Sequence, residues 1–174
     1  MAPARKSADA KENMKSLLLS RVRQGLARFL FASLATLGVA QAAPRPEIVA
    51  AGLENPWGVA FLPDGRFLVT ERPGRLRVVA ADGQLGAPLA GLPPIAAGGQ
   101  GGLLDVLADS AFDRNRTLYF CFSEPEAGGP ANGTALARAR LSADASRLEE
   151  VRVIFRQRPK VVSRKHFGCR IVEA

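Results

Sequence analysis

The sequence has 174 residues, 47% of them hydrophobic and 23% charged, a composition typical of a globular chain and not of a disordered one. Its formal net charge of +8 would suit a nucleic-acid binder, but residues 1–42 alone hold seven Lys or Arg against two Asp or Glu. The rest of the chain has no dense basic patch interleaved with aromatic side chains, so we expect no nucleic-acid partner.

The first predicted element is a leader. Three arginines between residues 21 and 28 precede an apolar run over residues 29–40, and a small-x-small pattern follows at residues 40–42. This order is typical of a secretory signal peptide, and a run of 12 residues is too short to span a bilayer as a helix. We therefore predict a signal peptide over residues 1–42, with a retained membrane anchor as the alternative.

Met14 begins a more ordinary leader, so a mis-called start over residues 1–13 stays open. Cleavage after Ala42 would release a chain that begins at Ala43 into the periplasm or the medium, with no stable membrane span. The remaining residues, 43–174, form the predicted domain.

Beyond residue 43 the chain alternates short apolar segments with turn signals such as PDG, RPG and ADG, which is the pattern of β-hairpins. The first group of predicted strands covers residues 57–62, 66–71, 75–80 and, more weakly, 86–91. The second group covers residues 103–108, 117–124, 134–141 and 151–155. Two groups of four strands predict an all-β chain with two antiparallel sheets.

The two groups resemble each other, and a third begins at residues 166–172. Each places a glycine before an apolar strand, and these glycines, Gly58, Gly102 and Gly168, are 44 and then 66 residues apart. Polar insertions account for the longer second interval. Four strands in a repeat of about 40–50 residues are typical of a β-propeller, whose blades stack around an axis because each alone cannot bury both sheet faces.

A propeller closes with about four to eight blades. This sequence reaches Ala174 after about two blades and the first strand of a third. We therefore expect residues 43–174 to be a truncated β-propeller domain, either the N-terminal portion of a longer protein or the product of a truncated gene.

Gln100 and His166 each stand two residues before one of these glycines. The first strand of every blade lines the channel, so equal places in the repeat predict that both side chains reach one channel mouth, within roughly 10 Å of each other. The glycines around Gln100 would let a flat ligand approach the backbone. His166 is the sole histidine and could act as a general base. The ordinary alternatives are a surface histidine beside Lys165 and a turn glutamine that bonds backbone.

Two further patterns predict local features. Cys121 and Cys169 do not make a disulfide framework, and we expect both to be buried free thiols. Asn132 to Thr134 spell NGT, a weak match to a glycosylation acceptor in a turn-like loop.

Several segments resemble the soluble pyrroloquinoline-quinone (PQQ) dependent aldose sugar dehydrogenases of the glucose/sorbosone type: NPWGVAFLPDGRFLVTERPGRLRVV, GGQGGLLDV, ADSAFDRNRTLYF and HFGCR. The resemblance runs from about Ile48 to Val172. It implies a six-bladed β-propeller in the periplasm that oxidises an aldose sugar at its anomeric carbon. It also implies PQQ across the channel mouth with Ca²⁺ beside it, and it leaves the electron acceptor open.

The resemblance also implies roles for two residues. His166, in the HFG motif, would be the catalytic base that takes the hydroxyl proton while hydride passes to the quinone, and it would therefore lie at the cofactor. Gln100, in GGQGG, would contact both cofactor and sugar. The resemblance assigns no metal ligand to this chain.

The sequence departs from the family pattern around this motif. Arg164 and Lys165 stand where the family has small or polar residues and could disable the site, and Cys169 replaces a Ser or Gly. The groups that grip the quinone carboxylates and the calcium ion are expected in later blades. We therefore expect the chain by itself to be inactive. The alternatives are a non-catalytic secreted propeller-type binding protein and a decayed gene relic.

Overall fold

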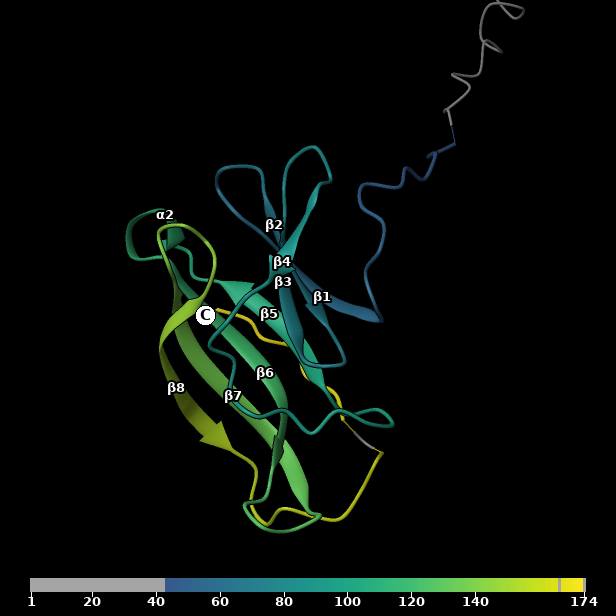
Figure 1. Cartoon of the computed structure of the whole chain (residues 1–174), viewed down its shortest axis with the longest axis vertical. Coiled ribbons are helices and arrows are strands. Elements are labelled where there is room, and N and C mark those ends of the chain that lie inside the picture. Colours follow the sequence, from purple (N-terminus) through teal and green to yellow (C-terminus); the bar gives the residue numbers. More distant parts are fainter. Residues whose placement is uncertain (1–42, 166, 174) are drawn as a thin grey trace, which may run out of the picture. The chain divides into compact units, whose positions relative to one another are not determined.

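The structure is a computed structural model, and it describes residues 43–165 and 167–173 (Figure 1). The chain divides into two units, residues 1–46 and 47–174. Within the first unit, the described residues 43–46 form neither helix nor strand. The predicted signal peptide lies outside the described residues. All that follows concerns the second unit.

The second unit contains two four-stranded antiparallel sheets, each with its strands in sequence order. The first consists of β1 (Pro56–Phe61), β2 (Phe67–Glu71), β3 (Arg75–Val79) and β4 (Leu85–Pro88). The second consists of β5 (Leu103–Ala108), β6 (Thr117–Pro125), β7 (Asn132–Leu141) and β8 (Leu148–Arg156). The eight predicted strands and their grouping are confirmed. A short helix that the sequence analysis did not predict, α2 (Phe112–Asn115), joins β5 to β6.

The hairpin turns form because the predicted turn residues bond their own backbone. The Asp64 carboxylate accepts hydrogen bonds from the Arg66 N–H at 3.1 Å and from the Arg66 guanidinium. Asp82 accepts in the same way from the Gln84 N–H at 3.0 Å in the next turn. Such side-chain bonds favour a turn over a continued strand.

The hydrophobic core lies between the two sheets. Burial alternates along β7, as expected for a strand with one face in the core. The core includes side chains from both sheets, such as Leu68, Leu76, Leu103, Phe120 and Phe122. The two backbones approach closely at Gly58, where an added Cβ would lie 3.0 Å from the Leu104 carbonyl oxygen. Stacked four-stranded sheets with sequential strand order are the arrangement of adjacent propeller blades.

The pairing register corrects the predicted alignment of the repeats. Val59 pairs with Val69 in the first sheet, and Val106 pairs with Phe120 in the second, each just after an irregularity in its ladder. This register matches Gly58 with Asp105, and not with Gly102 as the sequence alignment had it. The alignment was wrong by three residues because Gly58 lies within β1, whereas Gly102 directly precedes β5.

The predicted first strand of a third blade is not present in residues 167–173, which belong to no strand. A strand requires a hydrogen-bonded neighbouring strand. Here the Ile171 N–H donates instead to the Asp105 side chain, at 2.8 Å. The two complete sheets remain as predicted.

The prediction of two free thiols was wrong. Cys121 in β6 and Cys169 form a disulfide, and their Cα atoms are 6.5 Å apart, within the range that a disulfide spans. They are 48 residues apart in sequence. Only the path of the chain back along the second sheet brings them together.

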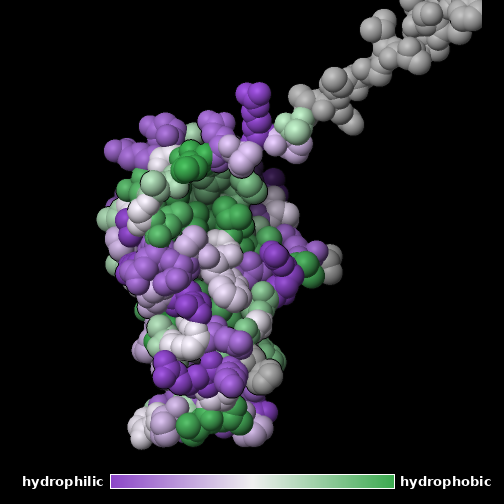
Figure 2. Space-filling view, turned by 90° about the vertical axis from the view of Figure 1, so that its right-hand side faces the viewer, coloured by the Kyte–Doolittle hydropathy of each residue, from purple (hydrophilic) through white to green (hydrophobic). Residues whose placement is uncertain are grey.

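One face of the first sheet is apolar and open. A hollow of about 450 Å³ on this face is bordered by Ile48 and Val49 of the preceding segment and by side chains of the first sheet, including Val59, Phe61 and Phe67. Phe61 is 72% exposed. Figure 2 shows apolar side chains gathered on this side of the molecule.

Candidate functional site

The GGQGG segment forms a tight turn. The Gly101 N–H donates to the Gly98 carbonyl at 2.9 Å, and the Gly98 N–H donates back to the Gly101 carbonyl at 3.3 Å. Gln100 stands exposed within this turn. The turn leads directly into β5, the first strand of the second sheet, so its position is fixed by that sheet.

Two of the glycines are required by the protein's own backbone. Gly99 has φ +59°, and an added Cβ would lie 2.3 Å from the Arg164 carbonyl oxygen. A Cβ at Gly102 would lie 2.0 Å from the Arg72 carbonyl oxygen. Real Cβ atoms do not approach a carbonyl so closely. Close packing of two other segments therefore explains these glycines without any ligand, a reason that the sequence analysis missed.

The turn lies against the segment that leads to the HFG motif. The Gln100 N–H donates to the Arg164 carbonyl at 2.9 Å. Gln100 is thus held beside a residue only two positions before His166, although 66 residues separate the two predicted site residues. His166 lies outside the described residues, so the predicted approach of the two side chains stays a prediction.

Arg72 holds the other side of the turn. Its guanidinium donates to the Gly99 carbonyl at 2.5 Å, and its own carbonyl accepts from the Leu103 N–H at 3.1 Å. Arg72 follows the last residue of β2 and therefore links the first blade to the glycine turn. The sequence analysis did not identify it, because nothing in the sequence signals a contact across 27 residues.

The neighbouring residue, Glu71, fixes the chain at the start of this link. Its carboxylate is fully buried and accepts from the Arg75 guanidinium at 2.6 Å and from the Glu54 N–H at 2.5 Å. Burial raises the pKa of Glu71, but these hydrogen bonds and the charges of Arg75 and Arg77 outweigh it and hold the pKa below its ordinary value. Glu71 is therefore ionised at neutral pH and stabilises the turn that carries Arg72.

Asn132 organises the segment before His166. Its N–H donates to the Val161 carbonyl and its carbonyl accepts from the Val161 N–H, both at 3.0 Å. Its side-chain amide donates to the Ser163 carbonyl at 3.0 Å. The predicted glycosylation acceptor thus has its amide nitrogen engaged in a structural contact. The NGT pattern gave no signal of this role.

Two hollows border the glycine turn. One, of about 230 Å³, is lined by Asn55, Arg72, Pro73, Ala97 and three glycines of the turn. The other, of about 140 Å³, is lined by Ala96, Ala97, Gly98, Asn132, Ser163, Arg164 and Phe167. Each therefore combines glycine backbone with one arginine. This chemistry suits a polar or anionic ligand that lies over the turn.

The described residues contain no group of three or more His, Cys, Asp or Glu side chains placed to hold a metal ion. Among the same residues no helix is long and apolar enough to cross a membrane.

Comparison with known proteins identifies the family. Residues 53–174 match the family model described as Glucose / Sorbosone dehydrogenase. The aldose sugar dehydrogenase YliI of Escherichia coli (strain K12) is 43% identical over 137 residues, which cover 78% of this chain and 37% of that protein.

Similarity to solved structures points to the same family. A glucose dehydrogenase structure is 49% identical with a TM-score of 0.68, over 72% of this chain and 39% of that one. The PQQ-bound form of an aldose sugar dehydrogenase from Streptomyces coelicolor is 27% identical with a TM-score of 0.56, over 67% of this chain and 34% of that one.

The chain spans about a third of the length of the curated relatives that it matches. The match covers both sheets, the glycine turn and the HFG segment. The predicted family and the propeller fold are thereby confirmed, and this chain belongs to the glucose/sorbosone dehydrogenase family.

Proposed function

We propose that this chain contributes the base-bearing part of the site in a PQQ-dependent dehydrogenase that oxidises an aldose sugar at its anomeric carbon. Family membership supports the reaction class, and one relative of known structure binds PQQ. The observation that carries the proposal is the 2.9 Å hydrogen bond from the Gln100 N–H to the Arg164 carbonyl. It holds the glycine turn beside the segment that leads to His166.

The groups around the turn fit part of a flat, anionic quinone. The turn presents glycine backbone without side chains, and Arg72 and Arg164 place a cation in each neighbouring hollow. A guanidinium is well suited to a carboxylate. When bound, PQQ supplies the two-electron oxidation and accepts the hydride that leaves the anomeric carbon.

The chain's own residues would bind the sugar and move its proton. Gln100 has both a donor and an acceptor in its side-chain amide, so it can orient a sugar hydroxyl. His166 would take the proton of the anomeric hydroxyl, which raises electron density at the C–H bond and leaves a carbonyl at that carbon. The sugar product is then the lactone.

The remaining roles are also proposals. Ca²⁺ is proposed by resemblance alone, and since the described residues offer no group of three candidate ligands, we derive no step through it. We further propose export to the periplasm or the medium, which the leader over residues 1–42 supports.

The experiment uses a chimera, because the chain spans about a third of its curated relatives. Residues 43–174 replace the matching part of the E. coli aldose sugar dehydrogenase, and the purified chimera receives PQQ and Ca²⁺. We expect dye-linked oxidation of a free aldose and formation of its lactone. The corresponding methyl glycoside, blocked at the anomeric oxygen, should give no turnover. Equal turnover of both sugars would contradict oxidation at the anomeric carbon.

A further inference from the structure

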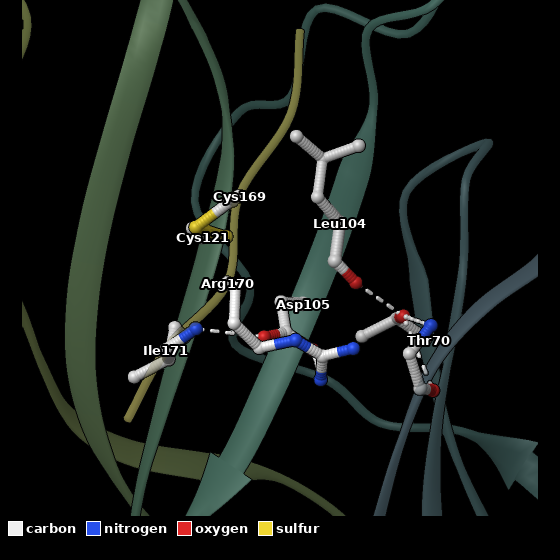
Figure 3. The surroundings of a disulfide bond; sticks show 8 residues. Thr70, Leu104, Asp105, Cys121, Cys169, Arg170 and Ile171 are labelled. Atoms are coloured by element: carbon white, nitrogen blue, oxygen red, sulfur yellow. Dashed lines mark hydrogen bonds and ion pairs between the residues drawn. A yellow bond between two sulfur atoms is a disulfide. The ribbon is translucent and has the colours of Figure 1, made fainter. Parts of the chain in front are cut away.

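The disulfide fastens the segment after His166 to the second blade. Cys121 is fully buried in β6, and its partner Cys169 comes three residues after His166 (Figure 3). Gly168 directly precedes Cys169, and beyond its chain neighbours no atom lies within 4 Å of the place where a Cβ would be. No other described segment packs against that side of Gly168, so the covalent bond at Cys169 is one of the constraints on this backbone.

A second anchor lies two residues further on. Asp105 of β5 is buried, with 4% of its surface exposed. One carboxylate oxygen accepts from the Ile171 N–H at 2.8 Å, and the other lies 3.5 Å from the Arg170 guanidinium (Figure 3). An acid within an otherwise apolar strand requires such partners, because an unpaired buried charge is costly. The segment therefore meets the strand that begins at the glycine turn.

The first blade has a residue at the position of Cys121, and this residue makes its contact with the next segment without a covalent bond. The Arg72 N–H donates to the Asn55 carbonyl, and in the second blade the Ser123 N–H donates to the Gly102 carbonyl. These matched bonds place Thr70, two residues before Arg72, at the position of Cys121.

Thr70 fastens its own blade to the next one. Its hydroxyl accepts from the Gly58 N–H at 2.8 Å and donates to the Leu104 carbonyl at 2.5 Å (Figure 3). Thr70 in the first sheet and Cys121 in the second sheet thus each hold the segment of chain that follows their own sheet. Thr70 does so by a hydrogen bond, and Cys121 does so by a disulfide.

The segment before His166 is anchored as well. The Asn132 side chain holds the Ser163 carbonyl, and the Gln100 N–H holds the Arg164 carbonyl. Anchors therefore stand on both sides of His166 in the sequence. Those before it are single hydrogen bonds, and the nearest one after it is the disulfide.

We propose that Cys121 and Cys169 are a positioning pair for the segment that carries His166, so that the placement of the proposed base depends on the disulfide. This inference rests on the proposed function, since it concerns how the proposed base is held. Asp105 assists as a hydrogen-bonded anchor of the same segment. The pair suits an exported protein, because disulfides persist outside the cytoplasm.

The test uses the single histidine as a reporter. Every sample is the full chain with Phe61→Lys, which should reduce association through the open apolar face, with His labelled with ¹⁵N and no histidine tag. NMR then gives one set of imidazole signals, from His166. We compare this reference with Cys121→Ser, Cys169→Ser and the double variant. We expect each variant to shift the imidazole signals of His166, because the environment of the ring changes when the anchor after it is lost. Hydrogen exchange of residues 167–173 should become about tenfold faster.

Thr70→Val is the matched control, because it removes the equivalent contact between the first and second blades. It should lower stability while the His166 imidazole signals and the exchange of residues 167–173 stay unchanged. Unchanged imidazole signals in the cysteine variants would overturn the inference, as would an equal change in Thr70→Val, which would indicate general loosening.

A second measurement covers variants that fail to fold. The oxidised reference is treated with a phosphine, which breaks the S–S bond, leaves two thiols and, with one water, becomes the phosphine oxide. In a uniformly ¹⁵N-labelled sample, the His166 signals should shift while the backbone amide signals of β1 to β4 persist, and absence of a shift would overturn the inference. Because the samples contain neither sugar nor quinone, failure here leaves the proposed function standing. If the His166 signals respond to the disulfide but the chimera shows no oxidation, the anchoring of the segment stands and the proposed function fails.

Discussion

At the scale of single residues, contacts between distant segments decide which positions around the glycine turn tolerate change. Gly99 has the Arg164 carbonyl where a side chain would be, and Glu71 is a buried carboxylate held by arginines. Gly99 belongs to the turn, and Glu71 acts on the turn from outside it. Two substitutions test these two effects separately.

Gly99→Ala should destabilise the protein by about 2 kcal/mol, because it adds a backbone clash to the cost of a positive φ. Gly128→Ala is the matched control, since Gly128 has φ +74° and nothing within 4 Å of the added carbon. The control should cost about 1 kcal/mol. Urea unfolding monitored by tryptophan fluorescence measures both. Equal losses would contradict the close approach of Arg164 to the turn.

Glu71→Gln should lower the free energy of unfolding by about 2 kcal/mol at neutral pH, because it removes a charged partner of two arginines. The folded-state pKa of Glu71 is lowered, so its contribution is complete above the unfolded pKa of about 4.3 and is lost as pH falls through the folded pKa. Unfolding curves at several pH values should therefore converge for wild type and variant in acid.

Asp113→Asn, at an exposed acid of α2, is the control and should follow the wild type at every pH. A Glu71→Gln variant that stays less stable by the same amount in acid would show that the effect of Glu71 comes from packing and not from its charge.

At the scale of elements, the sequence predicted what depends on local pattern. Alternating apolar residues and turn residues located all eight strands, because both signals act over a few neighbouring positions. The alignment of the repeats on Gly58 and Gly102 was wrong because each glycine is required by a close contact of its own. Gly102 lies against Arg72 across the blade interface, and Gly58 lies against Leu104.

The parts of the site that the sequence analysis missed all depend on long-range contacts. The Cys121–Cys169 disulfide, the Asn132 clamp on Ser163 and the Asp105 contact with Ile171 span 48, 31 and 66 residues. Only Asp105 gave a signal, as an acid within an apolar strand. A pattern of neighbouring residues cannot report such pairings, since the fold that creates them has to be known first.

The leader carries a prediction at this scale. We expect cleavage after Ala42, because the apolar run over residues 29–40 is followed by a small-x-small pattern. Expression of the whole gene with secretion, followed by N-terminal sequencing, should give a chain that begins at Ala43. A mature protein that still begins at Met1 or Met14 would contradict it.

At the scale of the whole molecule, the open apolar face sets the behaviour of the 174-residue polypeptide when it is prepared alone. Val59 and Phe61 are 52% and 72% exposed on that face. Extensive exposed apolar surface favours association. We expect this polypeptide to self-associate and to show no sugar oxidation with added PQQ and Ca²⁺.

Sedimentation velocity and a dye-linked assay check this, and Phe61→Lys should reduce the association. Robust turnover by the polypeptide would show instead that copies assemble into a competent site, or that the catalytic assignment is wrong.

In the proposed reaction, this chain supplies the base, His166. The most direct measurement compares the chimera with its His166→Ala variant, for both turnover of an aldose and binding of PQQ followed by absorbance. We expect turnover to fall by at least about 100-fold, the scale of a lost general base, while the PQQ dissociation constant changes little. Turnover near the wild-type rate in His166→Ala would contradict it.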